Sequence, residues 1–490
     1  MVTLALGNHL TLRSFLAASL CTATLIILLI VLFFLMRIRI HTVWFFLMVF
    51  IVSFLYASLW TVSFPYPFGV PVRAELRLLS DPRIRQNALE YTARIRGTVS
   101  QYSDIRDVEP SKKLRFPKQR VLLHLPIRVE YPQRGDIVSV RGLFSDLPQG
   151  RSGEYALYLK SRGIQVLFEG SSRDFRVVRR VPIVSFVSMS NRLKAYVRRV
   201  NDRLLLWPHT EFATALLTGN RDDLPWELAE NFRRSGTMHI LAVSGLHIGF
   251  LVFFFLFLCK ILRINQSASH MALILAVLFY MVFIGDAPSV KRASLMVLCG
   301  IVLFLFDRDR NYLNVLAVAF NILWISNPLS IINPGFILSF TATFAILFLV
   351  PHVQRVFVEL IPQFISVPIA LSVGIQVYLL PVMLSFFGSF SYITVIANLP
   401  IVPLAGVALA LEIFTLLLYP VLLPASVIVA EVNIVVMSTI FRLAGLFARV
   451  PPFEVRTFPK ILIPVYFLTL TGILVLLFYR GRINPASQGN

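Results

Sequence analysis

Two histidines and a serine stand at the start of a long apolar stretch, residues 235–250 (SGTMHILAVSGLHIGF). Polar side chains are costly in lipid, so they usually face the interior of a helix bundle or a water-filled cavity. A single helix over residues 238–258 would place Ser244 and His247 three residues apart on one face. We therefore expect His239, Ser244 and His247 to line a functional path. The alternative is that His247 only bonds a neighbouring carbonyl.

The same stretch offers two further interpretations. Gly245 and Gly249 form a GxxxG pair, a spacing that lets another helix pack closely. Ser244 and His247 are also the residue types of a nucleophile and its base. That chemistry needs an oxyanion hole, and a serine followed by glycine is common in membrane helices. We therefore expect no catalytic residue and no enzymatic activity, with an intramembrane serine hydrolase as the alternative.

The elements that position these residues are predicted to be transmembrane helices. Hydrophobic residues make up 57% of the 490 residues and charged residues only 14%. This composition is typical of a polytopic membrane protein with one soluble insertion. Residues 15–36 and 44–64 are each long and apolar enough to span a bilayer. Arg37 and Arg39 lie between them, and because cationic loops stay in the cytoplasm, the segment after residue 64 is expected outside.

After residue 237 we predict about nine further spans, which gives about 11 transmembrane helices in all. They cover residues 238–258, 270–284, 290–306, 312–325, 336–350, 365–387, 393–418, 425–446 and 461–479. The positions of the basic loops agree with an N-terminus outside and a C-terminus inside. The fold class is therefore a polytopic α-helical membrane protein with one small extracytoplasmic β domain.

The β domain is predicted from short alternating segments within residues 65–182. These segments are residues 91–99, 120–125, 136–144 and 163–168, separated by turn-rich sequence. Several short strands at this spacing predict a small barrel or sandwich. Residues 65–207 hold 27 Lys and Arg against 13 Asp and Glu, a balance of +14 within a total of +21.

One loop of this domain concentrates positive charge around an aromatic ring. Its residues are Lys112, Lys113, Arg115, Phe116, Lys118 and Arg120. Basic side chains beside an aromatic ring suit single-stranded nucleic acid, with charge on the phosphates and a ring under a base. The alternative is contact with anionic lipid headgroups.

Residues 182–207 predict an amphipathic helix that lies in the membrane interface. Its apolar side carries Leu193, Val197, Val200 and Leu204, and its arginines lie off that side. Such a helix ties a soluble module to the membrane surface. The same arginines would also suit a basic approach to a pore.

Several polar residues recur in the later spans. Lys291 and Arg292 begin one span, where they favour an anionic solute or snorkel to headgroups. Asn398 lies with Pro400 and Pro403 in another, a pattern typical of a broken helix that lines a cavity. Glu412 and Glu431 lie deep in late spans, where they would relay protons or pair with Arg442.

The sequence contains no known motif for binding a nucleotide or a metal ion. The sequence contains no GxxxxGK[ST] loop, no HExxH helix and no cysteine-rich cluster. We therefore expect no cofactor and no metal site. The three cysteines form no pairing pattern and do not identify a redox compartment.

The segment from Ala215 to Phe250 resembles the signature block of the ComEC-type competence proteins, the inner-membrane channels for DNA uptake. Weaker matches follow in the family's order. They are PSVKRA (288–293), PGFILSF (334–340), NLP (398–400) with Pro403, and upstream YALYLKSRGI (155–164). Many members continue into a metallo-β-lactamase-like domain, whose HxHxDH cluster does not occur here. We therefore expect a short form of the family.

The resemblance implies a channel that translocates single-stranded DNA into the cytoplasm across the bacterial inner (cytoplasmic) membrane. It implies two N-terminal spans (1–64), an extracytoplasmic OB-like β domain (65–181), interfacial and signature helices (182–236) and a transmembrane channel core (237–490). The path would include His239, Ser244, His247, Lys291, Arg292 and Asn398. Expected partners are single-stranded DNA, membrane lipids, a separate nuclease, a DNA receptor, a cytoplasmic motor and, as an open alternative, a second copy of the chain. A transporter of another anionic polymer is the remaining alternative.

Overall fold

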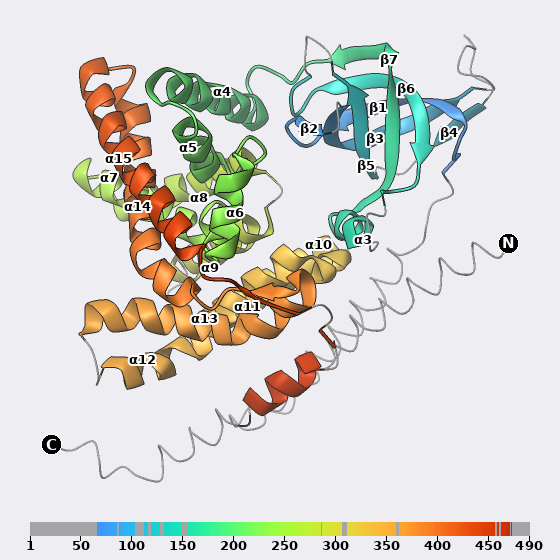
Figure 1. Cartoon of the computed structure of the whole chain (residues 1–490). Coiled ribbons are helices and arrows are strands. Elements are labelled where there is room, and N and C mark those ends of the chain that lie inside the picture. The colour runs from blue at the N-terminus through green and yellow to red at the C-terminus, as the bar shows by residue number, and fades with distance from the viewer. Residues whose placement is uncertain are drawn as a thin grey trace. The chain divides into compact units, whose positions relative to one another are not determined.

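A computed structural model describes residues 66–85, 88–102, 112–115, 119–127, 132–148, 154–285, 287–305, 311–358, 362–455, 458–459, 462–470 and 472 (Figure 1). The described residues form two compact units. One comprises residues 66–375 and 391–452, and the other comprises residues 376–390 and those from 453 onward. The predicted spans at 15–36 and 44–64 lie outside the described residues, as do Phe116 and Lys118.

Five long strands of the β domain close into a barrel. They are β1 (Pro71–Leu78), β3 (Ala88–Gln101), β5 (Arg120–Pro126), β6 (Ile137–Ser145) and β7 (Ile164–Arg179). The pairings run β1–β6–β7–β5–β3 and return to β1, with only β5–β7 parallel. This closed order agrees with the OB-like barrel that the resemblance implied. All four predicted segments fall in these strands to within one residue.

Alternation of apolar and polar residues builds the barrel core. On β1, Val72, Ala74, Leu76 and Leu78 are buried while the residues between them are partly or fully exposed. Because side chains alternate between the two faces of a strand, every second residue reaches the interior. Tyr91, Phe144 and Phe168 fill that interior from neighbouring strands.

Two short strands and one helix extend the barrel. β2 (Arg83–Arg85) and β4 (Lys112–Arg115) each pair with β3, so the predicted basic loop is partly a strand. α3 (Glu154–Ser161) joins β6 to β7 and covers a second apolar cluster that contains Leu122 and Leu159.

Three amphipathic helices follow the barrel. They are α4 (Phe186–Leu204), α5 (His209–Thr218) and α6 (Trp226–Arg234). Val197 and Val200 of α4 are buried as predicted, whereas Leu193 is exposed. Trp207, between α4 and α5, and Trp226, the first residue of α6, are 70% and 79% exposed, as is typical of tryptophans at a membrane interface.

The remaining helices are mostly apolar. They are α7 (Gly245–Ile261), α8 (Gln266–Ile284), α9 (Pro288–Leu305), α10 (Tyr312–Ser326), α11 (Pro334–Phe348), α12 (Val350–Val358), α13 (Gln363–Phe387), α14 (Thr394–Leu418) and α15 (Leu423–Phe447). Among the described residues, five of them (α8, α9, α13, α14 and α15) are long and apolar enough to cross a membrane. α7, α10 and α11 are shorter apolar helices, so the predicted total of about 11 spans is not confirmed.

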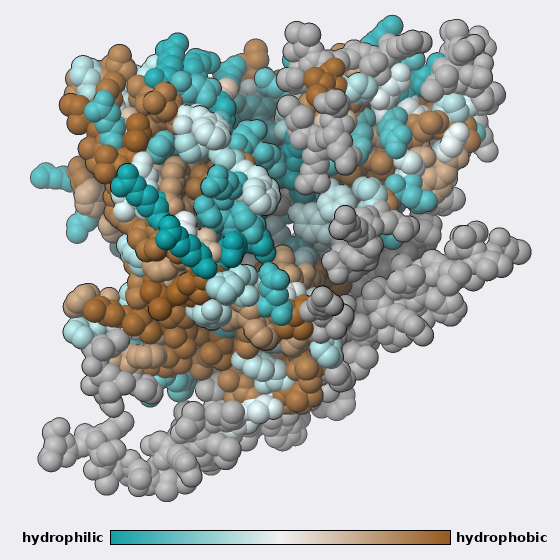
Figure 2. Space-filling model, in the orientation of Figure 1, coloured by the Kyte–Doolittle hydropathy of each residue, from teal (hydrophilic) through white to brown (hydrophobic). Residues whose placement is uncertain are grey.

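The apolar helices present hydrophobic side chains on their outer surface. Figure 2 shows apolar side chains over much of the visible face of the helical region. Phe253 of α7 and Val435 of α15, for example, are 68% and 67% exposed. A large apolar surface of this kind is typical of a face that contacts lipid. The chain is therefore a membrane protein with a β domain.

The expectation of a broken helix at Asn398 is wrong. α14 runs without interruption from Thr394 to Leu418 and contains Pro400 and Pro403. Both prolines fall in its first three turns, and neighbouring helices can compensate the backbone bonds that proline removes in a membrane helix. A described helix begins and ends within four residues of each predicted span at 270–284, 290–306, 312–325, 336–350, 365–387 and 425–446. The predicted span at 461–479 lies partly outside the described residues.

Candidate functional site

The turn between α6 and α7 is fixed by contacts with the start of α14. Gly236 adopts a φ of 75°, a left-handed conformation that glycine accepts readily. A Cβ atom at Gly236 would collide with the side chain of Thr394. The Ser391 hydroxyl donates to the Arg234 carbonyl at 2.6 Å, and the Thr394 hydroxyl lies 3.3 Å from the Ser235 carbonyl. α6 therefore ends at Arg234, directly before this turn.

The expectation of one helix over residues 238–258 is wrong. A short 3₁₀ helix, η1 (Met238–Ile240), is followed by a bend, and α7 begins only at Gly245. The Ser244 carbonyl accepts the amide of His247 at 3.2 Å, so Ser244 stands at the N-terminus of the helix. His239 therefore belongs to a different element from His247.

His247 is buried and bonded through both ring nitrogens. Its Nε2 lies 2.9 Å from the Leu216 carbonyl, and its Nδ1 accepts the backbone N–H of Ser244 at 3.2 Å. This pattern requires a neutral ring with the proton on Nε2. The Leu216 carbonyl belongs to the last turn of α5, where the helix itself leaves carbonyls unpaired. His247 thus connects the end of α5 to the start of α7.

This geometry gives no support to a serine hydrolase. The Ser244 Oγ lies 3.5 Å from the His247 Nδ1, which is beyond the 2.6–3.2 Å expected of a nucleophile and its base. Nδ1 already accepts a backbone N–H, and Nε2 is held by a carbonyl. The alternative that His247 bonds a neighbouring carbonyl is the arrangement observed.

Arg292 lies where three of the sequence blocks meet. Its Nη1 donates to the Ser339 carbonyl of α11 at 2.6 Å. Its Nη2 lies 3.5 Å from the point that a Cβ atom would occupy if Gly245 carried one. Beside it, the Ser289 hydroxyl donates to the Val243 carbonyl at 2.7 Å. Arg292 is only 8% exposed, so this side chain holds the ends of α7, α9 and α11 together.

The candidate path residues therefore divide into two groups. His247 and Arg292 are buried, which corrects the expectation that they face water. His239 is exposed, with Nδ1 3.2 Å from the Gly236 carbonyl. Ser244 and Lys291 are half-buried.

Asn398 is half-buried in α14. Its Nδ2 donates to the Ser372 hydroxyl of α13 at 3.4 Å, and its Oδ1 has no partner among the described residues. Of the GxxxG pair, only Gly245 has close neighbours. No described atom lies within 4 Å of a Cβ placed on Gly249.

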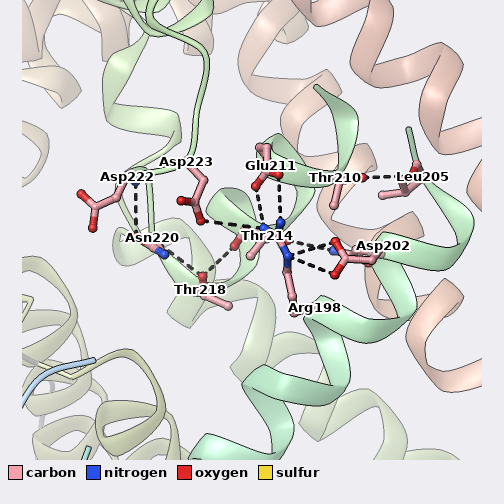
Figure 3. A network of polar contacts seen from close by, with 11 residues as sticks. Arg198, Asp202, Leu205, Thr210, Glu211, Thr214, Thr218, Asn220, Asp222 and Asp223 are labelled. Atoms are coloured by element: carbon pink, nitrogen blue, oxygen red, sulfur yellow. Dashed lines mark hydrogen bonds and ion pairs between the residues drawn. The ribbon is translucent and has the colours of Figure 1, made fainter. Parts of the chain in front are cut away.

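A polar network ties α4 to the signature block. Arg198 binds Glu211 through two nitrogens at 2.6 and 3.0 Å, and it also pairs with Asp202 and Asp223 (Figure 3). The hydrogen bond to Glu211 raises the pKa of Arg198 above its usual value. Because this arginine is neutralised, the network favours the anchoring interpretation of α4 over a basic approach to a pore.

The barrel contacts the membrane helices through two polar joints. Asn333, which caps α11, donates to the Ser161 hydroxyl at 2.9 Å, and Asn327 donates to the Ser161 carbonyl at 2.8 Å. Arg134 donates to the Val282 carbonyl of α8 at 2.6 Å. Ser161 comes from the upstream block and Asn333 directly precedes the PGF block, so these two sequence blocks meet at a joint.

Three arginines form a row across the outside of the barrel. Arg77 of β1 lies opposite Arg94 of β3, and Arg94 lies opposite Arg120 of β5. Residues opposite one another in paired strands share a face, and like charges there destabilise the sheet. Burial lowers the pKa of Arg94, and the charges of Arg120 and Arg77 lower it further. Arg94 Nε has no hydrogen-bond partner among the described residues.

The prediction of basic loop residues found only one member of this row. Arg120 was chosen for its place in the loop, and its Nη1 also donates to the Arg162 carbonyl at 3.1 Å. Arg77 and Arg94 are far from it in sequence, so only the strand register brings them together. Lys112, Lys113 and Arg115 lie on β4, which pairs with the other end of β3.

Comparison with known proteins gives a family match and two relatives. The family model described as "Competence protein" matches residues 216–482. The protein "ComE operon protein 3" of Bacillus subtilis (strain 168) is 28% identical over 211 residues, which is 43% of this chain and 26% of that protein. "Uncharacterized protein YcaI" of Escherichia coli (strain K12) is 24% identical over 337 residues, 63% of this chain and 42% of that protein.

No solved structure matches the chain. The chain spans between 26% and 42% of the length of the two relatives. The resemblance read from the sequence is confirmed, because the family model covers more than half of the 490 residues. The chain belongs to the Competence protein family, a family with a role in DNA uptake.

Proposed function

We propose that this protein is an inner-membrane channel that passes single-stranded DNA into the cytoplasm. The observation that carries the proposal is the arginine row Arg77, Arg94 and Arg120 on the barrel. Opposed like charges cost folding energy, so their placement is explained best by an anionic ligand that binds them together. An OB-like barrel uses its second and third strands to bind oligonucleotides, and β3 and β5 hold those positions here.

The barrel would receive the strand outside the membrane, with the phosphates on the arginine row. The strand would then pass the accessible polar residues His239, Ser244, Lys291 and Asn398. His247 and Arg292 would hold the helix ends that shape this path, because both bond backbone carbonyls. Strand degradation and the pulling force would come from a separate nuclease, a DNA receptor and a cytoplasmic motor.

Binding of labelled oligothymidine to the full-length protein in neutral-lipid nanodiscs tests the receptor role. The logarithm of the affinity should fall linearly with the logarithm of salt concentration, by about 0.7 per phosphate contact. Arg94→Gln should weaken binding and reduce this slope by about 0.7. Arg176→Gln is the matched control, since Arg176 is exposed on β7 outside the row. Equal weakening by both variants would contradict the proposal.

The stability of the same variants adds an independent test. Removing one of three opposed arginines relieves repulsion, so Arg94→Gln should stabilise the DNA-free protein at low salt by about 0.2–1 kcal/mol. A row that served only the fold would give a loss of stability instead. Polyphosphate at equal phosphate concentration should compete less well than DNA, because it offers no base to stack. Equal competition would favour a transporter of another anionic polymer.

A further inference from the structure

Glu412 of α14 is the one ionisable residue of that helix, and it is 1% exposed. Its Oε2 accepts the Nδ2 of Asn433 on α15 at 3.3 Å. The side chain of Asn201 on α4 lies beside this carboxyl, and its Nδ2 lies 3.3 Å from the Thr214 hydroxyl of α5. Asn201 and Asn433 are each 1% exposed, so four helices enclose the carboxyl.

Several buried acceptor oxygens around Glu412 receive no hydrogen bond from the described residues. The oxygens Glu412 Oε1, Asn201 Oδ1 and Asn433 Oδ1 have no partner among the described residues. The amide nitrogens donate to Glu412 Oε2 and to the Thr214 hydroxyl, and within the described part of the chain no hydrogen bond reaches the three buried oxygens. Leaving a buried polar atom unpaired costs about 1–3 kcal/mol. A proton on Glu412 Oε1 turns one of these acceptors into a donor that can bond another.

Among the described residues, no cationic side chain pairs with the Glu412 carboxylate. Around it, Arg198 binds Glu211 and Asp202, and Arg203 donates to the Tyr419 hydroxyl at 2.7 Å. His209 bonds Ser438 at 2.8 Å. Glu431 and Arg442 of α15 are exposed whereas Glu412 is buried, and the predicted pairing of Glu412 with Arg442 is not observed among the described residues. An unpaired buried carboxylate is strongly disfavoured, and such groups neutralise instead.

We propose that Glu412 is a proton-binding site whose bound proton fastens α4 to α14 and α15. α4 already touches α14 through the Tyr196 hydroxyl, which donates to the Leu416 carbonyl at 2.7 Å. Loss of the proton leaves a charged carboxylate among amide oxygens and releases Asn201. The site then opens α4 from the bundle. This inference does not depend on the proposed DNA channel.

Hydrogen–deuterium exchange of α4 in the full-length protein in nanodiscs tests the site. After correction for intrinsic exchange, opening of α4 should increase about tenfold for each pH unit above about 5, until the closed site loses its proton. Glu412→Gln carries a neutral isostere and should abolish this dependence. Glu431→Gln, an exposed glutamate on α15, should keep it. The same pH dependence in the wild type and in Glu412→Gln would overturn the proposal.

The wild-type protein supplies a second measurement if Glu412→Gln does not fold. Infrared spectra should contain a protonated carboxyl at neutral pH that disappears at high pH together with α4 protection. The absence of a protonated carboxyl at neutral pH would overturn the proposal. Exchange is also measured in sodium chloride and in choline chloride. Equal rates support a proton site, whereas protection that requires sodium would make the ligand a sodium ion and contradict the proposal.

Discussion

At Leu216, the last turn of α5 leaves a carbonyl oxygen that the helix does not pair, and His247 supplies the donor. The sequence favoured a lining role for this histidine because polar residues in lipid usually face water. An unpaired backbone carbonyl at a helix end can also accept a hydrogen bond from a polar side chain, so such a side chain need not face water. The residue types thus predicted correctly that His247 has a polar partner. That the partner is the Leu216 carbonyl depended on where α5 ends relative to α7.

We expect His247→Leu to destabilise the protein, because it leaves the Leu216 carbonyl and the Ser244 amide unpaired. Each buried group left without a partner costs about 1–3 kcal/mol. Chemical denaturation in detergent micelles measures the change. Gly249→Ala is the control, since an added Cβ there meets no described atom and alanine favours the helix. A loss in His247→Leu no larger than in Gly249→Ala would remove the capping role.

Gly236→Ala tests the turn that separates α6 from α7. The left-handed backbone at this position costs a residue with a Cβ about 1–2 kcal/mol, and the collision with Thr394 adds about 1–3 kcal/mol. The double variant Gly236→Ala with Thr394→Ala should recover part of the loss. Absence of any recovery would show that Thr394 does not confine this turn.

At the scale of elements, hydrophobic patterning placed the strands and the helices well. The segments 120–125 and 136–144 lie in β5 and β6, and the spans from α8 to α15 follow the apolar runs. Patterning failed at α7, where Met238 continues the apolar run although the helix begins at Gly245. It also failed at Pro400, because a membrane helix retains prolines that would break a soluble one.

The packing of α5 on α15 should depend on pH through His209. Its ring lies 2.8 Å from the Ser438 hydroxyl and 5.1 Å from the Phe441 ring centroid. Burial lowers the pKa of His209, and a hydrogen bond to Leu206 opposes this in part. A base whose folded pKa is depressed binds its proton more weakly in the folded state. Stability is therefore present above about pH 6.5 and declines as the pH falls below it.

The expected loss is below about 1 kcal/mol between pH 7.5 and 5.5, because the ring is half-buried and solvent screens the charge. Thermal unfolding of the Glu412→Gln protein at the two pH values measures this loss without the contribution of Glu412, and adding His209→Gln should remove the difference. The sign is opposite to that expected of Glu412. A Glu412→Gln protein that is more stable at pH 5.5, with no change when His209→Gln is added, would exclude His209 as the cause.

For the whole molecule, composition predicted a membrane protein with an external basic module, and the family match agrees with that class. The arginine row was not predictable, because Arg77, Arg94 and Arg120 are joined by strand register and by no local motif. The polar joints at Ser161 and Asn333 explain two of the sequence blocks as contacts between the barrel and the helices. Under the proposed function, DNA received on the barrel would lie next to the bundle that would carry it.

Uptake of labelled DNA into a nuclease-protected compartment tests the central claim most directly. Cells that lack the gene are complemented with the wild type, with Arg77→Gln/Arg94→Gln/Arg120→Gln, or with a control of equal charge change, Arg176→Gln/Arg179→Gln/Arg192→Gln. We expect the row variant to lose protected DNA by at least about tenfold, since the phosphate contacts supply most of the affinity. The control should take up DNA like the wild type. Normal uptake by the row variant, at equal protein abundance in the membrane, would contradict the account.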